Sequence, residues 1–271
     1  MRKVAWIVVA GLAVVLAVAG WWHINALADP VVRRTRLALP DWPAGAKPVT
    51  VALISDIHIG NSTMDAERLT RIVSQINGLK PDLVLIAGDY VAGHDVDVAR
   101  AGAGNLVVPL SRLRAPLGVV AVLGNHDQSV PTVIAAALGR AGVTVLDNAA
   151  VVRGPLMIGG VGDAFSGHDD LPATLRGMAG LPGARVILTH SPDLSLAVPP
   201  GIGVLFAGHT HCGQGVLPIV GAPRVFWKPG LMCGLVRRDG LTTVITAGLG
   251  TSGVPMRFRA PADVWVVTLG A

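Results

Sequence analysis

The sequence has little of several features that mark other classes of protein. It holds only two cysteines, Cys212 and Cys233, in 271 residues, which excludes a disulfide-rich scaffold and leaves room for one bridge. Charged residues make up only 14%, and no run of Lys and Arg is interleaved with aromatics, so the net charge of +5 does not indicate a nucleic-acid partner. Apolar residues reach 51%, without a repeat or low-complexity run, which predicts a globular chain with a sizeable core.

Glutamate is almost missing. Glu67 is the only glutamate among 17 acidic residues, and the others are aspartates. Aspartate favours turns, caps and metal sites over helix surfaces. The functional carboxylates are therefore expected in loops.

A long uncharged run occupies the N-terminus. Arg2-Lys3 precedes residues 4–22, and these nineteen residues, at about 1.5 Å each, just span a hydrocarbon core of about 30 Å. Trp21-Trp22 ends the run where an interfacial aromatic belt would lie. The small residues of Ala26-Leu27-Ala28 also fit a signal-peptide cleavage site. The length of the run favours an uncleaved transmembrane anchor, and a cleaved signal peptide is the alternative.

The chain divides into three expected segments: an anchor or signal peptide (1–28), an extended proline-containing lead-in (29–48) and a globular domain (49–271). Arg2-Lys3 would hold the N-terminus inside, although Arg33, Arg34 and Arg36 compete with this pair. We expect a single-pass protein of the cell membrane whose globular domain lies outside the cytoplasm.

Short apolar, β-branched runs recur along the globular part, and polar loops follow them. The runs expected to form strands cover residues 49–54, 83–87, 119–123, 156–161, 186–188, 203–207, 243–246 and 264–269. Helical patterns lie between the early strands, beginning near Ser62-x-x-Asp65, within 97–114, and at Ser129 followed by Pro131. This alternation predicts an α/β fold with buried sheets.

Histidines and carboxylates cluster after five of the expected strands. The clusters are Asp56-x-His58, Gly88-Asp89, Gly124-Asn125-His126-Asp127, Thr189-His190 and Gly208-His209-Thr210-His211. A turn or a structural histidine would explain several of them singly, but one sheet would bring all these strand ends together, which favours a shared metal site. Imidazole, carboxylate and amide donors without thiolate suit Zn, Mn or Fe. Seven candidate ligands exceed one tetrahedral ion and suit two divalent ions that share a carboxylate.

This ordered set of motifs resembles that of the calcineurin-like metallophosphoesterases, from about residue 49 to the C-terminus. The resemblance implies an α/β fold in which a two-sheet β-sandwich is flanked by helices. Residues 55–58, 189–193, 248–253 and 257–259 also resemble a membrane-anchored or exported bacterial branch. That branch includes phosphodiesterases of the UDP-2,3-diacylglucosamine pyrophosphatase type.

The resemblance implies a role for each matched position. One metal ion would be held by Asp56, His58 and His211, a second by Asn125, His190 and His209, with Asp89 bridging the two. His126 would be a catalytic residue facing the substrate beside Asn125, and Asp127 would orient His126 and raise its basicity.

The implied activity is hydrolysis of a phosphodiester or pyrophosphate bond, in a substrate that can be lipid-linked. A hydroxide bridging two divalent ions (Mn, Zn or Fe) would attack the phosphorus. One alternative is a broad-specificity phosphodiesterase or phosphatase acting on soluble or cell-wall phosphates. Another is a metal-binding protein without turnover, against which the intact His126-Asp127 pair argues.

Three further features leave alternatives open. Cys212 stands where the bacterial branch usually has glycine, and it can be an inert residue, an extra ligand or a disulfide partner of Cys233. Arg257 and Arg259 can hold a second phosphate or lipid head group, or belong to a surface hairpin. Two loop histidines, His94 and His168, can line the pocket or be solvated.

Overall fold

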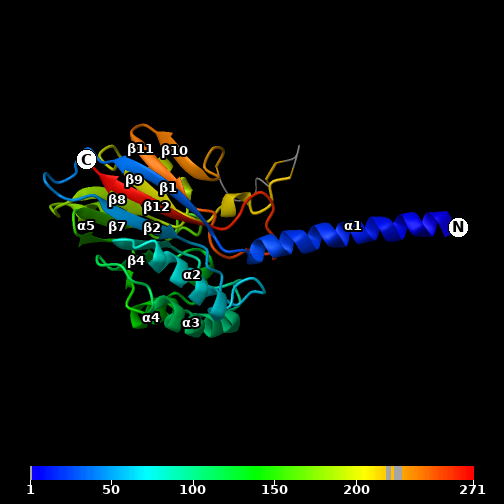
Figure 1. Ribbon diagram of the computed structural model, residues 1–271. Helices are drawn as coiled ribbons and strands as arrows, with labels where there is room; N and C mark the ends of the chain where they lie inside the picture. Colours follow the sequence, from blue (N-terminus) through cyan, green and yellow to red (C-terminus); the bar gives the residue numbers. More distant parts are fainter. Residues whose placement is uncertain (1, 218–220, 223–227) are drawn as a thin grey trace.

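A long N-terminal helix projects from the rest of the molecule as a single rod (Figure 1). The computed structural model describes residues 2–217, 221–222 and 228–271. Helix α1 (Arg2–Leu27) contains one stretch, Val9–Leu27, that is long and apolar enough to cross a membrane, and only 6% of it is buried against the rest of the chain. The apolar N-terminal run therefore forms one continuous helix, as the sequence predicts.

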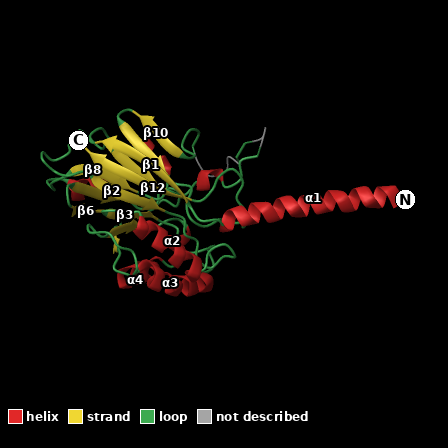
Figure 2. Ribbon diagram, in the orientation of Figure 1, coloured by secondary structure: helices red, strands yellow, loops and turns green. Residues whose placement is uncertain are grey.

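Two six-stranded sheets form the centre of the globular part (Figure 2). The first sheet has the order β1-β12-β2-β3-β4-β5, from strands β1 (Val31–Ala38), β2 (Val49–Ile54), β3 (Leu83–Ala87), β4 (Val119–Val122), β5 (Thr144–Val145) and β12 (Asp263–Gly270). The second has the order β10-β11-β9-β8-β7-β6, from strands β6 (Ala149–Arg153), β7 (Leu156–Gly160), β8 (Ala184–Leu188), β9 (Val204–Ala207), β10 (Gly234–Arg238) and β11 (Leu241–Ile245).

Alternating side chains build three apolar layers. Val51 and Leu53 of β2 point into the layer between the two sheets, whereas Ala52 and Ile54 belong to the layer under the helices, as the two-residue period of a strand requires. That outer layer is covered by helices α2 (Ala66–Gly78), α3 (Val96–Leu110) and α4 (Pro131–Arg140). Helix α5 (Leu171–Met178) covers the outer face of the second sheet. The predicted two-sheet sandwich flanked by helices is confirmed.

Parallel pairing places the functional loops at one edge of the sandwich. Strands β2, β3 and β4 are mutually parallel in the first sheet, and β7, β8 and β9 are parallel in the second. Backbone hydrogen bonds continue past the strand ends, from Asp56 N–H to the Gly88 carbonyl (2.9 Å) and from Gly208 N–H to the His190 carbonyl (3.0 Å). The loops that follow these strands are therefore held side by side.

Local boundaries differ from the sequence prediction in two places. Helix α2 is capped by Asp65, whose side chain accepts a hydrogen bond from Arg68 N–H, rather than beginning at Ser62. The segment 29–48 is extended, but its first part is also the edge strand β1, which pairs in parallel with β12. Such long-range pairing leaves no mark in the local pattern of β1, because the partner strand lies more than 200 residues away.

Candidate metal centre

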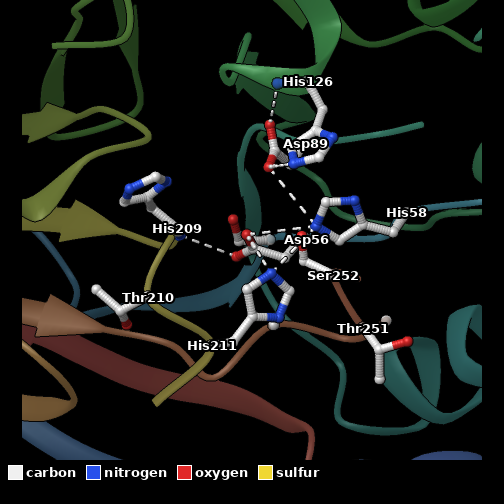
Figure 3. A network of polar contacts seen from close by, with 12 residues as sticks. Asp56, His58, Asp89, His126, His209, Thr210, His211, Thr251 and Ser252 are labelled. Atoms are coloured by element: carbon white, nitrogen blue, oxygen red, sulfur yellow. Dashed lines mark hydrogen bonds and ion pairs between the residues drawn. The ribbon is translucent and has the colours of Figure 1, made fainter. Parts of the chain in front are cut away.

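The structure brings all seven candidate ligands to one place, beyond the carboxyl ends of β2, β3, β4, β8 and β9. Figure 3 shows the side chains of Asp56, His58, Asp89 and His211 facing one another. Three groups of these residues could each hold a metal ion: Asp56 with His58 and His211, His58 with Asp89 and His126, and Asp56 with Asp89 and His190. The strand ends therefore supply one cluster of donors.

The first part of the cluster surrounds Asp56. The Nε2 atoms of His58 and His211 lie 3.1 Å apart. Oδ1 of Asp56 lies 3.4 Å from His211 Nε2 and 3.9 Å from His58 Nε2. All three side chains are buried, and the second oxygen of Asp56 accepts a hydrogen bond from the His209 backbone N–H (3.1 Å).

The second part of the cluster surrounds Asn125. Its Oδ1 atom lies 3.1 Å from His190 Nε2 and 3.0 Å from His209 Nδ1, and these two ring nitrogens are 3.2 Å apart. Asp89 lies between the two parts, with Oδ2 3.6 Å from His58 Nε2 and 3.3 Å from His190 Nε2. This carboxylate is therefore within reach of both groups of donors.

Hydrogen bonds to backbone carbonyls set the protonation of two rings. Because a carbonyl can only accept, His58 Nδ1 donates to Val91 O (3.2 Å) and His190 Nδ1 donates to Ala87 O (2.6 Å). Whenever these rings are neutral, their lone pairs lie on the Nε2 atoms, which face the cluster. A metal-binding histidine usually donates the N–H of its other ring nitrogen to a carbonyl or carboxylate in this way.

Several ligand atoms in the cluster lack a suitable hydrogen-bond donor, and a bound cation would satisfy them. Oδ1 of Asp56 is buried and has no hydrogen-bond partner among the described residues, although two histidine rings face it. Oδ1 of Asn125 faces Nε2 of His190 at 3.1 Å, and two acceptors at that separation need a proton or a cation between them. The residues present therefore fit divalent metal ions.

Burial and neighbouring charges shift the pKa values within the cluster. Burial lowers the pKa of His58 to about 4, and burial together with the His58 ring lowers that of His211 well below its usual value. Burial raises the pKa of Asp56 to about 6. Burial also opposes ionisation of Asp89, but the facing His190 holds the Asp89 pKa well below its usual range. Burial also opposes the charged form of His190, but the facing Asp89 raises the His190 pKa well above its usual value. The cluster thus offers neutral imidazoles at His58 and His211 beside the ionised Asp89.

Strained backbone accompanies the cluster. Five candidate ligands have a positive φ: Asp56 (51°), His58 (49°), Asp89 (59°), His209 (70°) and His211 (50°). The left-handed region costs a non-glycine residue about 1–3 kcal/mol and persists where the surroundings hold it, often at functional sites. The loops also touch backbone to backbone, since a Cβ atom on Gly88 would lie 2.6 Å from Gly124 N. The geometry is therefore imposed by the packing of the loops.

His126 stands at the edge of the cluster. Its Nδ1 donates to the Gly93 carbonyl (2.9 Å), and its Nε2 lies 3.9 Å from Oδ2 of Asp89. Its backbone N–H donates to the other Asp89 oxygen (2.9 Å). The ring stacks on His94, with centroids 4.2 Å apart, which places that loop histidine at the pocket.

Asp127 does not orient the His126 ring, contrary to the sequence interpretation. Its carboxylate is fully buried and accepts hydrogen bonds from the backbone N–H groups of Asp89 (2.9 Å), Tyr90 (2.8 Å) and Gly124 (2.8 Å). Burial raises the pKa of Asp127 to about 7. Its contacts make Asp127 a positioning residue for the loops that carry Asp89 and Asn125.

The structure also shows the surroundings of Arg257, Cys212 and His168, for which the sequence left alternatives open. Arg257 is buried and donates to the backbone carbonyls of Ala247, Gly248, Gly250 and Ala260, so it is not available to a second phosphate. Cys212 forms a disulfide with Cys233, which resolves the three alternatives. His168 is exposed, contacts Ser166 Oγ and does not line the cavity at the cluster.

A cavity of about 750 Å³ opens onto the cluster. Asp89, Asn125, His126, His209 and His211 line its inner part. The sequence reasoning missed several lining residues, and the most distant of them along the chain is Trp22, from the apolar helix α1. Its only sequence signal was its position at the end of the apolar run, which the membrane interpretation had already explained.

Comparison with known proteins gives matches over most of the chain. The model of one family, the calcineurin-like phosphoesterases, matches residues 49–213. The chain is 31% identical over 278 residues to a Danio rerio protein named transmembrane protein with metallophosphoesterase domain, covering 95% of this chain and 61% of that protein. It is 28% identical over 261 residues to a metallophosphoesterase of Helicobacter pylori, covering 92% and 67%. A Bacillus subtilis metallophosphoesterase is 28% identical over 238 residues, covering 84% and 81%.

Proposed function

Because the chain belongs to the calcineurin-like phosphoesterase family, we propose that it hydrolyses a phosphodiester or pyrophosphate bond with two divalent metal ions held at this cluster. The observation that carries the proposal is the convergence of imidazole, carboxylate and amide donors from five loops. One ion would be held by Asp56, His58 and His211. The other ion would be held by Asn125, His190 and His209. Asp89 would bind both ions. The chain spans 61% of the length of its Danio rerio relative.

The residues of the chain divide the chemical work. When bound, two divalent ions lower the pKa of a water and offset the negative charge that builds on the phosphoryl oxygens. Asn125 contributes a neutral oxygen, so it adds no repulsion toward an anionic substrate. His126 keeps a proton on Nδ1 through Gly93, and its Nε2 atom would give a proton to the leaving oxygen. Asp127 would hold the loops that carry Asp89 and Asn125 in position relative to each other.

Metal content and turnover test this proposal together. The full chain, purified in detergent, is expected to bind about two divalent ions and to hydrolyse bis(4-nitrophenyl) phosphate with added Mn²⁺. Removing the ions with a chelator should abolish hydrolysis, and returning Mn²⁺ should restore it. Bound ions without turnover on any phosphoester would favour the metal-binding alternative. A chain with neither ions nor turnover would contradict the proposal.

The finer part of the proposal concerns the substrate and the membrane. Helix α1 is long and apolar enough to tie the domain to a bilayer, which supports a lipid-linked phosphodiester or pyrophosphate as substrate. The bacterial branch that includes UDP-2,3-diacylglucosamine pyrophosphatases remains part of this proposal, because residues 55–58, 189–193, 248–253 and 257–259 resemble it. Activity that does not depend on an acyl chain would favour the broad-specificity alternative.

The disulfide supports a domain outside the cytoplasm, because such bonds form and persist in oxidising compartments. Chain isolated from its own membranes with an alkylating reagent present is expected to carry no alkyl group on Cys212 or Cys233. Mass spectrometry of the intact chain measures this directly. Two alkyl groups would show reduced thiols and contradict the orientation.

The same bond is expected to stabilise the domain. It joins residues 21 apart, and loops of this size gain about 2–4 kcal/mol from a disulfide. The double variant Cys212→Ser/Cys233→Ser should lose about that much free energy of unfolding, measured by urea denaturation. Reducing agent should lower the stability of the wild type but not that of the double variant. Equal stability of the two proteins under oxidising conditions would contradict the expectation.

A further inference from the structure

The mouth of the metal cavity is built partly by the membrane helix. Trp22 of α1, and Val254, Met256 and Phe258 of the loop between β11 and β12, line the outer part of the cavity. We call these four residues the apolar lip. The cavity thus has donors of the metal cluster at its inner end and an apolar surface at its mouth.

Specific contacts hold the loop residues of the apolar lip against α1. The rings of Trp22 and Phe258 stack with centroids 4.8 Å apart, and Trp21 meets Phe258 edge-on at 5.8 Å. The backbone N–H of Arg257 donates to the Trp22 carbonyl (3.0 Å), and His23 Nδ1 contacts the Pro255 carbonyl (2.7 Å). The end of α1 is therefore packed against the loop rather than joined to the domain by a free linker.

The position of Trp22 in the helix gives the depth of the lip. Trp22 ends the uncharged stretch 4–22, which is about 28 Å long as a helix and matches the hydrocarbon core of a bilayer. The polar headgroup region on each side of a bilayer is about 5–7 Å thick, and tryptophan is enriched at this boundary. A spanning α1 would thus bring the lip to the surface of the bilayer.

The charged side chains that line the cavity limit the class of substrate that it can bind. Among the described residues that line it, Asp89 carries the only formal charge apart from the histidines, and no Lys or Arg is present. Among the described lining residues, a substrate with several phosphates or carboxylates would find histidine rings but no Lys or Arg side chain to pair with the additional charges. Val254 is 63% exposed, so the lip offers an open apolar surface next to the helix.

We propose that the end of α1 is a wall of the substrate site, and that the site takes an amphiphilic phosphoester whose apolar chain lies on the lip while its phosphoryl group faces Asp89 and His126. This inference rests on the proposed function. The apolar chain would stay in contact with the bilayer, since the lip continues the apolar surface of α1. Trp22 and Val254 are specificity-determining residues in this arrangement, and α1 is more than a tether.

Two esters with one reporter test the proposal. The full chain in phosphatidylcholine vesicles is assayed with 4-nitrophenyl phosphodiesters that carry either a methyl or a hexadecyl group. The quantity measured is the ratio of kcat/KM for the hexadecyl ester to that for the methyl ester. We expect Trp22→Ala and Val254→Asp each to lower this ratio about tenfold, equivalent to about 1.4 kcal/mol. Trp22→Phe should keep most of the ratio.

Trp6→Ala is the matched control. Trp6 lies on the same helix, is 73% exposed and is far from the cavity, so its loss should leave the ratio unchanged. Because every variant sits in the same vesicles, partitioning of the hexadecyl ester into the bilayer cancels between them. Val254 is on the surface, so its variant tests the lip even if Trp22→Ala folds poorly.

The outcomes separate this inference from the proposed function. A ratio that stays at the wild-type value in Val254→Asp and in folded Trp22→Ala would overturn the inference, while hydrolysis of the methyl ester would leave the proposed function standing. A wild type that hydrolyses neither ester would overturn both. An equal fall of the ratio in Trp6→Ala would also overturn the inference, because the effect would then belong to the helix as a membrane anchor.

Discussion

Replacing Asp89 with asparagine is expected to remove bound metal and to reduce phosphodiester hydrolysis by about 100- to 1000-fold, the loss seen when one preorganised electrostatic partner is removed. The carboxylate of Asp89 lies within 3.6 Å of His58 Nε2 and 3.3 Å of His190 Nε2, so it can serve both ions. An amide of the same shape cannot offset the charge of two divalent ions. Metal content per folded chain and kcat measure the two effects.

Asp82→Asn is the matched control for this variant. Asp82 lies just before β3, at the opposite end of the same strand, and its carboxylate accepts a hydrogen bond from Thr50 N–H (2.7 Å). This change alters a partly buried carboxylate without touching the cluster, so metal content should not change. Retention of two ions and of wild-type kcat by Asp89→Asn would contradict a bridging role.

Replacing His126 with alanine is expected to leave both metal ions in place and to lower kcat by about 100- to 10,000-fold, the usual contribution of a positioned acid or base. The Nδ1 atom is held by the Gly93 carbonyl, which leaves Nε2 to exchange a proton with the substrate. Nε2 also lies 3.9 Å from Asp89, close enough that a ligand role is the competing explanation.

Metal analysis decides between these roles of His126. An acid with no ligand role predicts unchanged metal content together with the loss of kcat. Loss of one ion on His126→Ala would instead make His126 a ligand. His168→Ala is the control, since His168 is an exposed loop histidine outside the cavity lining and its loss should change kcat by less than about twofold.

Much of the fold could be predicted from local patterns. The limits expected for β2 and β3 agree with the structure, because buried parallel strands are apolar along their whole length and end abruptly in polar loops. The short strands β5, β6 and β10 were not predicted. The first has only two residues, and the other two lie at sheet edges or in hairpins, where the pattern is weak.

The contacts of single side chains were harder to predict than the elements that carry them. Asp127 was expected to pair with His126 because the two are adjacent, but its carboxylate binds three backbone N–H groups of neighbouring loops. Arg257 was expected at a phosphate or on the surface, but carbonyl oxygens of the surrounding turns bury it. Hydrogen-bond partners depend on where loops cross, which no local pattern records.

The sequence by itself determined the apolar N-terminal helix, the α/β sandwich and the residues that meet beyond the strand ends. It could do so because strand and helix periods are local, and because parallel strands of one sheet end at the same edge. The tertiary structure alone decided the pairing of β1 with β12, the Cys212–Cys233 bond and the place of Trp22 at the cavity. Each of these contacts joins parts of the chain that meet only when the layers pack. The contacts therefore depend on tertiary packing and not on the local sequence.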